Sequence, residues 1–199
     1  NRLNFLTIVP MFHCNGWCYP WTIAMLNGRT ICLRNIDVKK VFALIDKYNV
    51  THFGGAPIVL NMITGAPESD RKKLKQKVHV LTAGAPPPSI IFKKMKDLGF
   101  EVMHVYGLTE TYGHVTQCAW NDEWNAYDED KQNEIKARQG VRYPNTEGVT
   151  VMDPETMKEV PSDGKTIGEI MIRGNVVMKG YFKDKDATDK AMAGGWFHS

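Results

Sequence analysis

The residues best suited to chemistry form the hexapeptide Tyr106-Gly-Leu-Thr-Glu-Thr111. It directly follows an apolar run that is predicted as a buried strand, so it lies at a carboxyl strand end, where α/β folds bind ligands. Gly107 permits a sharp turn and a close approach of the backbone to a ligand. Thr109 offers a hydroxyl, Glu110 a hard carboxylate suited to Mg²⁺, and Tyr106 a flat face for a base. In isolation the hexapeptide fits equally well a strand-to-helix connection in which a threonine caps the helix.

A second candidate turn lies upstream, in Leu81-Thr-Ala-Gly-Ala-Pro-Pro-Pro88. Gly84 and Ala85 have little or no side chain, so a flat heterocycle could lie against their backbone. Pro88 to Leu98 is predicted as a helix with proline near its first turn. Because a helix of this length joins parallel strands in a βαβ unit, we expect both turns at the same edge of one sheet.

Two further strand ends carry small or polar residues. Pro10-Met-Phe-His-Cys-Asn-Gly-Trp17 places His13 just past a strand and before a helix. A histidine in this place is more often a helix cap or a packed residue than a catalyst, and Asn15 favours a helix start. His52-Phe-Gly-Gly-Ala-Pro57 adds another glycine-rich turn at the same expected edge.

The elements that would position these residues alternate between short apolar runs and helical patterns. This alternation predicts an α/β fold, with a mainly parallel sheet built from βαβ units and helices on both faces. One helix is expected to begin after an Asp37 cap and to bury Val41, Phe42 and Ile45 on one face. The predicted strands are Phe5–Pro10, Thr30–Leu33, Thr51–Gly54, Val78–Thr82 and Phe100–Tyr106.

The pattern changes in the last third of the chain. Residues 121–139 form a polar excursion, expected to be part loop and part exposed helix. Further on, the strands Val149–Met152 and Glu169–Arg173 are separated by turn-forming residues and predict an antiparallel hairpin. Asp184 to Met192 is predicted as a short helix.

These patterns divide the chain into two parts. Residues 1–139 are expected to form a central α/β subdomain, and residues 140–199 the start of a small, antiparallel, β-barrel-like subdomain.

Composition restricts the function classes. The chain has 199 residues, a formal net charge of +3 and 43% hydrophobic residues, enough apolar material for a core. The basic run from Arg71 to Lys77 has no interleaved aromatics, so a solvated loop explains it better than nucleic-acid binding. Apolar runs stay well short of the ~20 residues of a membrane span. The four cysteines have neither CxxC nor metal-site spacing, which fits a reducing compartment.

Other short motifs do not fit their usual sites. Gly164-Lys-Thr166 lacks the earlier glycine of a phosphate loop, because Glu159 stands there. The acidic run that starts at Asp184 has Asp189 at the sixth place, where a calcium loop needs glycine. A GxSxG nucleophile elbow is not found in the sequence.

Four segments, in order, resemble core motifs of the adenylate-forming superfamily, which includes acyl-CoA synthetases, 4-coumarate–CoA ligases, luciferases and peptide-synthetase adenylation domains. They are Pro10-Met-Phe-His13, Tyr106-Gly-Leu-Thr-Glu-Thr111, Gly168-Glu-Ile-Met-Ile-Arg-Gly174 and Gly194-Gly-Trp-Phe-His198. The sequence Met11-Phe-His-Cys-Asn-Gly-Trp17, together with Lys136-Ala-Arg-Gln-Gly140, resembles the corresponding segments of plant-type acyl-activating enzymes similar to butyrate–CoA and benzoate–CoA ligases.

The resemblance implies a carboxylate–CoA ligase that uses ATP, Mg²⁺ and CoA and releases AMP and pyrophosphate. It implies that Thr109 contacts the AMP phosphate, that Glu110 holds Mg²⁺, and that His13 lines the junction between the acyl pocket and the adenylate. Arg173 would support the nucleotide from the β subdomain. The implied nucleotide-binding residues are Gly84, Ala85, Pro86, Tyr106, Gly107, Leu108 and Thr109, of which Tyr106, Gly107, Gly84, Ala85 and Pro86 would flank the adenine. The implied acyl pocket comprises His13, Asn15, Tyr19, Gly54, Gly55 and Ala56. Trp17 and Tyr19 would shorten this pocket and favour short-chain, medium-chain or aromatic acids.

The chain also departs from the family pattern. A phosphate loop with its lysine would precede the His13 segment, and it is missing. Gly194-Gly-Trp-Phe-His-Ser199 stops before the Gly-Asp whose aspartate would hold the ribose hydroxyls. The mobile carboxyl-terminal domain is missing too. We therefore expect a fragment of an enzyme about 2.5 to 3 times longer, inactive without the missing parts of its own chain.

Two alternatives remain open from the sequence. One is a naturally truncated, non-catalytic homologue that binds a nucleotide or a partner. The other lies within the superfamily: oxidation of the adenylate, or transfer to a carrier protein. The expected location is intracellular, either cytoplasmic or peroxisomal.

Overall fold

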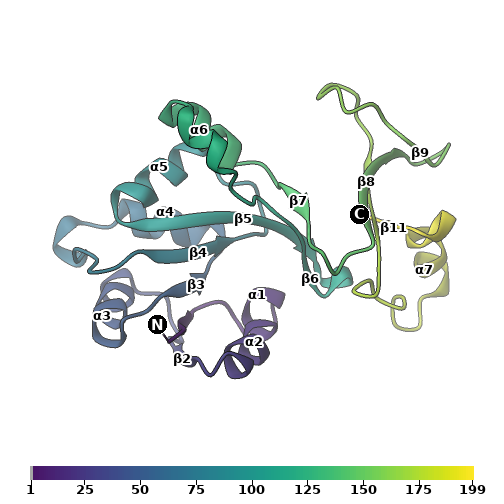
Figure 1. Ribbon diagram of the computed structural model, residues 1–199. Helices are drawn as coiled ribbons and strands as arrows, with labels where there is room; N and C mark the ends of the chain where they lie inside the picture. Colours follow the sequence, from purple (N-terminus) through teal and green to yellow (C-terminus); the bar gives the residue numbers. More distant parts are fainter. Residues whose placement is uncertain (1) are drawn as a thin grey trace.

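Two β-sheets organise the chain in the computed structural model, which describes residues 2–199 and, at positions 15 and 17, the backbone alone (Figure 1). Within these residues the larger sheet has seven strands in the order β2-β1-β3-β4-β5-β6-β7, and the smaller sheet has four in the order β11-β10-β8-β9. The strands are β1 (Asn4–Thr7), β2 (Arg29–Cys32), β3 (His52–Gly54), β4 (Val78–Thr82), β5 (Phe100–Leu108), β6 (Gly113–Gln117), β7 (Val141–Arg142), β8 (Gly148–Asp153), β9 (Lys158–Glu159), β10 (Glu169–Arg173) and β11 (Phe197–His198).

Seven α-helices and four 3₁₀ turns connect the strands in the described part of the chain. The α-helices are α1 (Cys14–Trp17), α2 (Tyr19–Met25), α3 (Val38–Tyr48), α4 (Pro57–Gly65), α5 (Ser89–Asp97), α6 (Glu129–Lys136) and α7 (Lys185–Ala191). The 3₁₀ turns are η1 (Glu68–Asp70), η2 (Thr109–Thr111), η3 (Asp122–Ala126) and η4 (Ala193–Gly195).

The helix α3 forms where its cap and apolar spacing predict it. The Asp37 carboxylate accepts a hydrogen bond from the backbone N–H of Lys40 at 3.1 Å, which satisfies one of the unpaired donors of the first turn. Val41, Phe42 and Ile45 are each at most 1% exposed. The helix ends at Asn49, whose φ of 50° is the left-handed conformation that commonly closes a helix.

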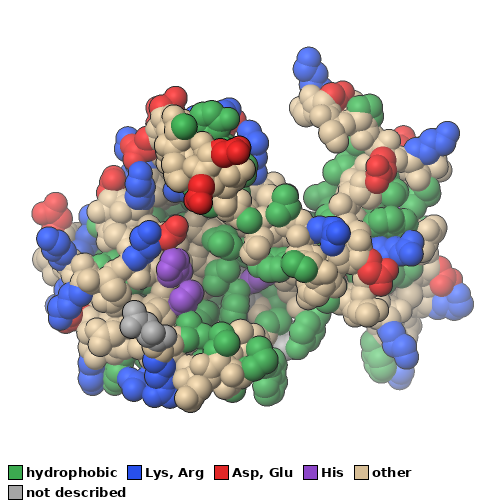
Figure 2. Space-filling model, in the orientation of Figure 1, with side chains coloured by type: hydrophobic (Ala, Val, Ile, Leu, Met, Phe, Trp, Pro, Cys, Tyr) green, Lys and Arg blue, Asp and Glu red, His purple; other side chains and the backbone are tan. Residues whose placement is uncertain are grey.

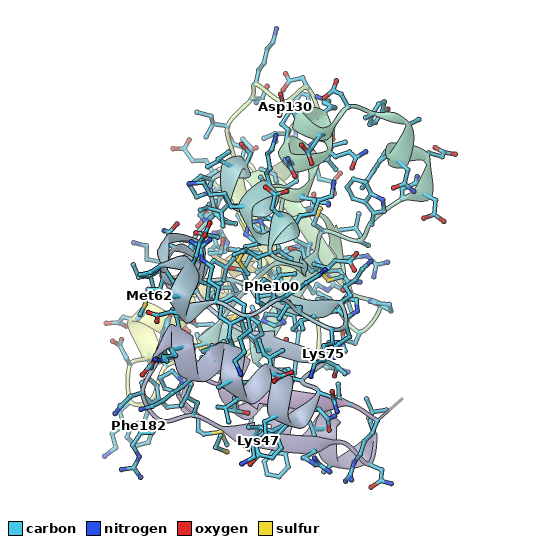
Figure 3. All side chains as sticks on the ribbon, turned by 90° about the vertical axis from the view of Figure 1, so that its left-hand side faces the viewer. Lys47, Met62, Lys75, Phe100, Asp130 and Phe182 are labelled. Carbon is cyan, nitrogen blue, oxygen red and sulfur yellow. The ribbon has the colours of Figure 1, made fainter. Side chains whose placement is uncertain are left out.

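Strands β2, β1, β3, β4 and β5 run parallel, as predicted. Side chains alternate between the two faces of this sheet. Leu6, Phe53 and Val80 share one face and join a core cluster with α3, α4 and α5. Phe100, 2% exposed, also lies in this cluster, and Figure 3 labels it near the middle of the molecule. On the opposite face Phe5 stacks on a tyrosine of α2, so helices cover both faces.

The larger sheet is not parallel throughout. Strands β6 and β7 are antiparallel to their neighbours and extend the sheet beyond β5. The predicted strand that ended at Tyr106 in fact continues to Leu108, because β6 folds back and hydrogen bonds to its last residues. The first strand is shorter than predicted and ends at Thr7, before the proline at position 10.

The smaller sheet is antiparallel, as predicted for the last part of the chain. Strands β8 and β10 pair over five residues, from Glu169 opposite Met152 to Arg173 opposite Gly148. They are not a simple hairpin, since β9 lies between them in sequence and pairs with β8 at the edge. Figure 1 shows this sheet and α7 beside the end of the larger sheet, joined to it through β6 and β7.

The polar excursion is part loop and part helix, as predicted, and its helix is partly packed. Asp128 accepts from the backbone N–H of Lys131 at 2.8 Å and begins α6. Ile135 is only 3% exposed, and its carbonyl accepts from the Cys118 thiol at 3.2 Å. This helix therefore lies against the sheet on one side, whereas the prediction placed it in solvent.

Candidate active site

The hexapeptide Tyr106–Thr111 forms a strand end, a 3₁₀ turn and the start of a hairpin. Strand β5 continues through Leu108, η2 follows, and Tyr112 takes a left-handed φ of 53° that turns the chain into β6. The strand-to-helix connection considered from the sequence is present only as the single 3₁₀ turn η2, which the Thr111 side chain caps, and strand β6 follows it. Gly107 is required by the return strand, because a Cβ on it would lie 1.9 Å from the carbonyl oxygen of Gly113.

The buried hydroxyl of Thr111 holds this turn in shape. Its Oγ1 accepts from the backbone N–H of Leu108 at 3.0 Å and lies 2.9 Å from the carbonyl oxygen of Gly113, to which it can donate. The side chain is 1% exposed. Thr111 thus closes both ends of the turn and leaves the residue at its start, Thr109, exposed.

The acidic candidate of this turn, Glu110, lies where the two sheets meet. Its backbone carbonyl accepts from the N–H of Met178 at 2.7 Å. Its Oε1 accepts from the hydroxyl of Tyr181 at 3.0 Å, and this hydrogen bond raises the pKa of the tyrosine. The carboxylate is therefore oriented by a residue of the β subdomain, 71 positions away in sequence.

Tyr106 and Leu108 lie in the same junction. Both pack against a second hydrophobic cluster, whose buried members are Val115, Ile172 and Phe197. Val115 comes from β6 and the other two from the smaller sheet. The ring of Tyr106 is half-buried by this packing, so the same cluster that joins the sheets also fixes the position of the candidate adenine-binding side chain.

Parallel register brings the other candidate adenine turn to the same edge. Thr82 of β4 is opposite His104 of β5. Gly84 and Tyr106 each come two residues later, so they lie at the same level of the sheet edge. Gly84 has a φ of 93°, and a Cβ on it would have no atom within 4 Å. Ala85 and Pro86 are exposed beside it.

His13 occupies the N-cap position of α1, as its place in the sequence suggested, but its side chain makes no capping hydrogen bond. The imidazole is exposed, with its centroid 4.5 Å from that of Phe12. Gly16 is required here because a Cβ on it would lie 2.2 Å from the carbonyl oxygen of Pro10. The segment is therefore a tight turn that presents His13 outward.

Tyr19 joins this segment to the hairpin. Its ring stacks on Phe5 with centroids 4.9 Å apart, and its hydroxyl lies 3.4 Å from Nδ1 of His114 on β6. Burial raises the pKa of Tyr19 and lowers the pKa of His114 to about 4, so both side chains are neutral at pH 7. Cys18, whose pKa is raised to about 11 mainly by burial, contacts the carbonyl oxygen of Tyr112 at 3.5 Å.

The third glycine turn follows β3. Gly54 and Gly55 are buried, and the N–H of Gly55 donates to the carbonyl of Leu81 at 2.9 Å. Ala56 is exposed and caps α4, whose first residue is Pro57.

Arg173 is at the far end of β10. It is exposed, with Nε 3.4 Å from a Glu147 carboxylate oxygen and its guanidinium 5.7 Å from the centre of the Trp196 ring. At the other end of β10, His198 of β11 contacts Glu169 through Nδ1 at 3.0 Å. Arg173 therefore joins β10 to the residues that precede β8 and β11, which is a structural role within the small sheet.

The structure therefore brings most candidate residues to one edge, where β1, β3, β4 and β5 end. Thr109, Glu110, Tyr106, Leu108 and Gly107 share one turn, and Gly84, Gly54 and His13 follow neighbouring strands. Arg173 belongs to the separate small sheet. Asn15 lies outside the residues whose side chains are described. Sequence reasoning missed His114 and Tyr181 as site residues, because neither lies in a motif with a recognisable chemical role.

A large hollow lies elsewhere. It measures about 1000 Å³ and is lined by residues that include His52, His79, Glu101, Met103 and Trp120. The rings of His52 and His79 stack with centroids 4.9 Å apart, and Figure 2 shows purple histidine side chains on this side of the molecule. None of the candidate residues lines it, so this hollow is separate from the strand-end edge that carries them.

The described residues contain neither a group of three or more metal-ligating side chains nor a helix long and apolar enough to cross a membrane. The other short motifs have structural roles. Asp163 accepts backbone hydrogen bonds from Thr166 and Lys165, which lower its pKa to about 2, and thereby closes an exposed turn. Asp184 caps α7.

Comparisons with known proteins relate the chain to AMP-binding enzymes and to CoA ligases. A family model described as AMP-binding enzyme matches residues 1–182. The chain is 54% identical over 197 residues to a peroxisomal acetate/butyrate–CoA ligase of Arabidopsis thaliana and 54% identical to an acetate–CoA ligase of Humulus lupulus. In both cases the match covers 98% of this chain and 34% of the relative, so the chain spans about a third of the length of these curated relatives.

Solved structures share the fold. The N-terminal domain of FACL13 from Mycobacterium tuberculosis has a TM-score of 0.78 and 26% identity, over 100% of this chain and 47% of that one. The o-succinylbenzoate coenzyme A synthetase of Bacillus subtilis has a TM-score of 0.77 and 20% identity, over 99% of this chain and 38% of that one.

Proposed function

We propose the function from one premise: this chain belongs to the AMP-binding enzyme family. It is part of a longer carboxylate–CoA ligase that uses ATP to form an acyl-adenylate and then passes the acyl group to CoA. The names of the two relatives at 54% identity, both CoA ligases, support this activity. Residues 1–139 are then the central subdomain of the large adenylation domain, and residues 140–199 begin its β-barrel-like subdomain.

One structural observation supports the proposal most strongly. Thr109 and Glu110 lie together in a turn at the end of β5, beside the Gly84 turn and against the smaller sheet. A phosphoryl transfer requires positioned donors and charge stabilisation rather than a protein nucleophile. An exposed hydroxyl next to an oriented carboxylate satisfies that requirement.

Each candidate residue then has a role. The Thr109 hydroxyl donates to the α-phosphate, which the substrate carboxylate attacks as the bond to pyrophosphate breaks. The turn at Gly84, Ala85 and Pro86 and the backbone at Gly107 flank the adenine, with Tyr106 against it. His13 lines the junction between the acyl pocket and the adenylate, where the CoA thiol later attacks the acyl carbon and AMP leaves.

The residues present fit Mg²⁺ as well. Mg²⁺ is usually bound by one or two carboxylates together with substrate phosphates and water, and the turn offers the single carboxylate of Glu110. When bound, the ion would neutralise phosphate charge. Glu110 would hold it, and Thr109 would bind the phosphate beside it.

The acyl pocket is proposed to lie on the sheet face that carries Tyr19, above Gly54. Tyr19 is immobilised between Phe5 and His114, so it would act as a fixed wall that limits chain length. The relatives named for acetate and butyrate support a short-chain acid. For location we propose the cytoplasm or the peroxisome, and the peroxisomal relative supports the second.

The test measures ATP–pyrophosphate exchange and acyl-CoA formation by the full-length protein, with CoA as the only thiol. We expect Glu110→Gln and Thr109→Ala each to lower kcat/KM by about 100-fold. Glu123→Gln is the matched control, because Glu123 is exposed and its side chain lies in η3, away from the turn.

Other outcomes would change the conclusion. Nucleotide binding with no exchange would favour a non-catalytic, nucleotide-binding homologue. Exchange without acyl-CoA would keep adenylation but move the second step to another acceptor or to oxidation. Full activity of Glu110→Gln would remove Glu110 from the site.

A further inference from the structure

The carboxylate of Glu110 has a hydrogen-bond partner that the candidate site does not yet use. Tyr181 belongs to the loop between β10 and α7, and its hydroxyl donates to Oε1 of Glu110 at 3.0 Å. Among the described side chains, this is the one that hydrogen bonds to Glu110. A carboxylate tied at one oxygen has a restricted orientation, so its other oxygen points in a defined direction.

The backbone of Tyr181 is itself anchored to α7. Its backbone N–H donates to Oγ1 of Thr188 on α7 at 2.9 Å, and Thr188 in turn donates to the carbonyl oxygen of Asp184 at 2.7 Å. Gly180 makes this approach possible, because a Cβ on it would lie 2.5 Å from Cγ2 of Thr188. The tyrosine is thus anchored to the first turns of α7.

The backbone of the same loop is anchored to the turn as well. The N–H of Met178 donates to the carbonyl oxygen of Glu110 at 2.7 Å. Met178 also packs with Val176 and Val177 against the cluster that joins the two sheets. Both the main chain and the side chain of Glu110 are therefore held by one loop of the β subdomain.

We propose that Tyr181 is a positioning residue, which orients the Glu110 carboxylate for a divalent cation and is itself set by Thr188. This inference rests on the proposed function, since it takes Glu110 as the carboxylate that holds Mg²⁺. Partners that orient metal ligands are commonly worth about 10- to 100-fold in metal affinity. The loop from Gly180 to Thr188 therefore contributes to metal binding although it offers no ligand of its own.

The experiment measures binding of Mn²⁺, a paramagnetic substitute for Mg²⁺, to the full-length protein with a non-hydrolysable ATP analogue. Free Mn²⁺ is followed by electron paramagnetic resonance. We expect Tyr181→Phe to weaken Mn²⁺ binding by about 10-fold and to raise the Mg²⁺ concentration needed for half-maximal exchange to a similar extent. Tyr127→Phe is the matched control, because Tyr127 is half exposed and lies beside α6.

A second pair of variants keeps the test valid if Tyr181→Phe does not fold. Thr188→Val removes the hydroxyl that accepts from Tyr181 and should weaken Mn²⁺ binding in the same direction, whereas Thr188→Ser retains the hydroxyl and should restore it. Unchanged or tighter Mn²⁺ binding in Tyr181→Phe, or equal affinities in Thr188→Val and Thr188→Ser, would overturn the inference.

The two proposals fail in different ways. If the unmodified protein binds Mn²⁺ and nucleotide but makes no acyl-CoA, the proposed ligase function is wrong. The positioning role of Tyr181 is then decided separately, by comparing the Mn²⁺ affinities of the unmodified protein and Tyr181→Phe. If the unmodified protein is an active ligase and Tyr181→Phe matches it in both measurements, only the positioning inference fails.

Discussion

The hydroxyl of Tyr19 lies 3.4 Å from Nδ1 of His114, although 95 positions separate the two residues in sequence. Tyr19 begins the helix after the His13 segment, and His114 is the second residue of the strand that returns from the Thr109–Glu110 turn. This contact joins two of the segments that carry the candidate site. It also fixes the proposed acyl-pocket wall relative to the proposed phosphate-binding turn.

A pH dependence of stability follows from His114. Burial lowers its pKa from 6.5 to about 4, so between these values the unfolded chain binds a proton that the folded chain does not. Its contribution to stability is therefore complete above pH 6.5 and is lost as the pH falls towards 4, with up to about 2 kcal/mol lost by pH 5. Thermal unfolding of the full-length protein at pH 7.5 and pH 5 should show a smaller difference for His114→Gln than for the unmodified protein.

The pKa of His114 can also be measured directly, through the pH dependence of hydrogen–deuterium exchange at the imidazole C2 position, read by mass spectrometry. A midpoint near 6.5 would contradict the burial of this ring.

Replacing Gly107 should disrupt the hairpin. In Gly107→Ala the new methyl group would lie 1.9 Å from the carbonyl oxygen of Gly113, which is a backbone atom that cannot move without displacing β6. We expect a loss of about 3 kcal/mol or more in stability, together with loss of exchange activity. The measurement is the thermal midpoint of the full-length protein and its ATP–pyrophosphate exchange rate.

Gly65→Ala is the control for that substitution. Gly65 ends α4, and a Cβ on it would have no atom within 4 Å, so alanine there should be neutral or stabilising by about 0.5 kcal/mol. Equal thermal midpoints for the two alanine variants would show that β5 and β6 do not approach as closely as described.

The buried hydroxyl of Thr111 should be needed, whereas its methyl group should matter less. Thr111→Val removes the acceptor for the Leu108 N–H and the potential donor to the Gly113 carbonyl, at a cost of about 1–3 kcal/mol. Thr111→Ser keeps the hydroxyl and should lose about 1 kcal/mol for the missing methyl group. If valine is tolerated as well as serine in thermal unfolding, these hydrogen bonds do not hold the turn.

The choice of acid should depend on Tyr19. If this side chain limits the acyl pocket, Tyr19→Ala should raise the ratio of kcat/KM for hexanoate to that for acetate by roughly 10-fold or more. A screen from acetate to palmitate measures the change, with Tyr127→Ala as the control. An unmodified protein that accepts only very long acids would refute the short-chain proposal, and an unchanged ratio in Tyr19→Ala would remove Tyr19 from the pocket wall.

The sequence by itself was sufficient for the parallel part of the larger sheet, because each of those strands is a short apolar run followed by a helix with a recognisable cap or spacing. Strand β4 (Val78–Thr82) and strand β10 (Glu169–Arg173) have the predicted bounds. The family also follows from local residues, because its motifs are contiguous and keep their order along the chain. Strands β7, β9 and β11 have two residues each, and so short a strand has no periodicity to recognise.

Contacts between distant parts of the chain required the tertiary structure. The extension of β5 to Leu108 depends on the returning strand β6. Glycine is needed at position 107 because the backbone of Gly113 on β6 lies against it, and this contact exists only in the folded hairpin. The orientation of Glu110 depends on Tyr181, and the neutral state of His114 depends on burial beside Tyr19. Sequence patterns show which residue types lie close together along the chain. Hydrogen bonds and burial between distant residues depend on distances in space, which only the folded structure sets.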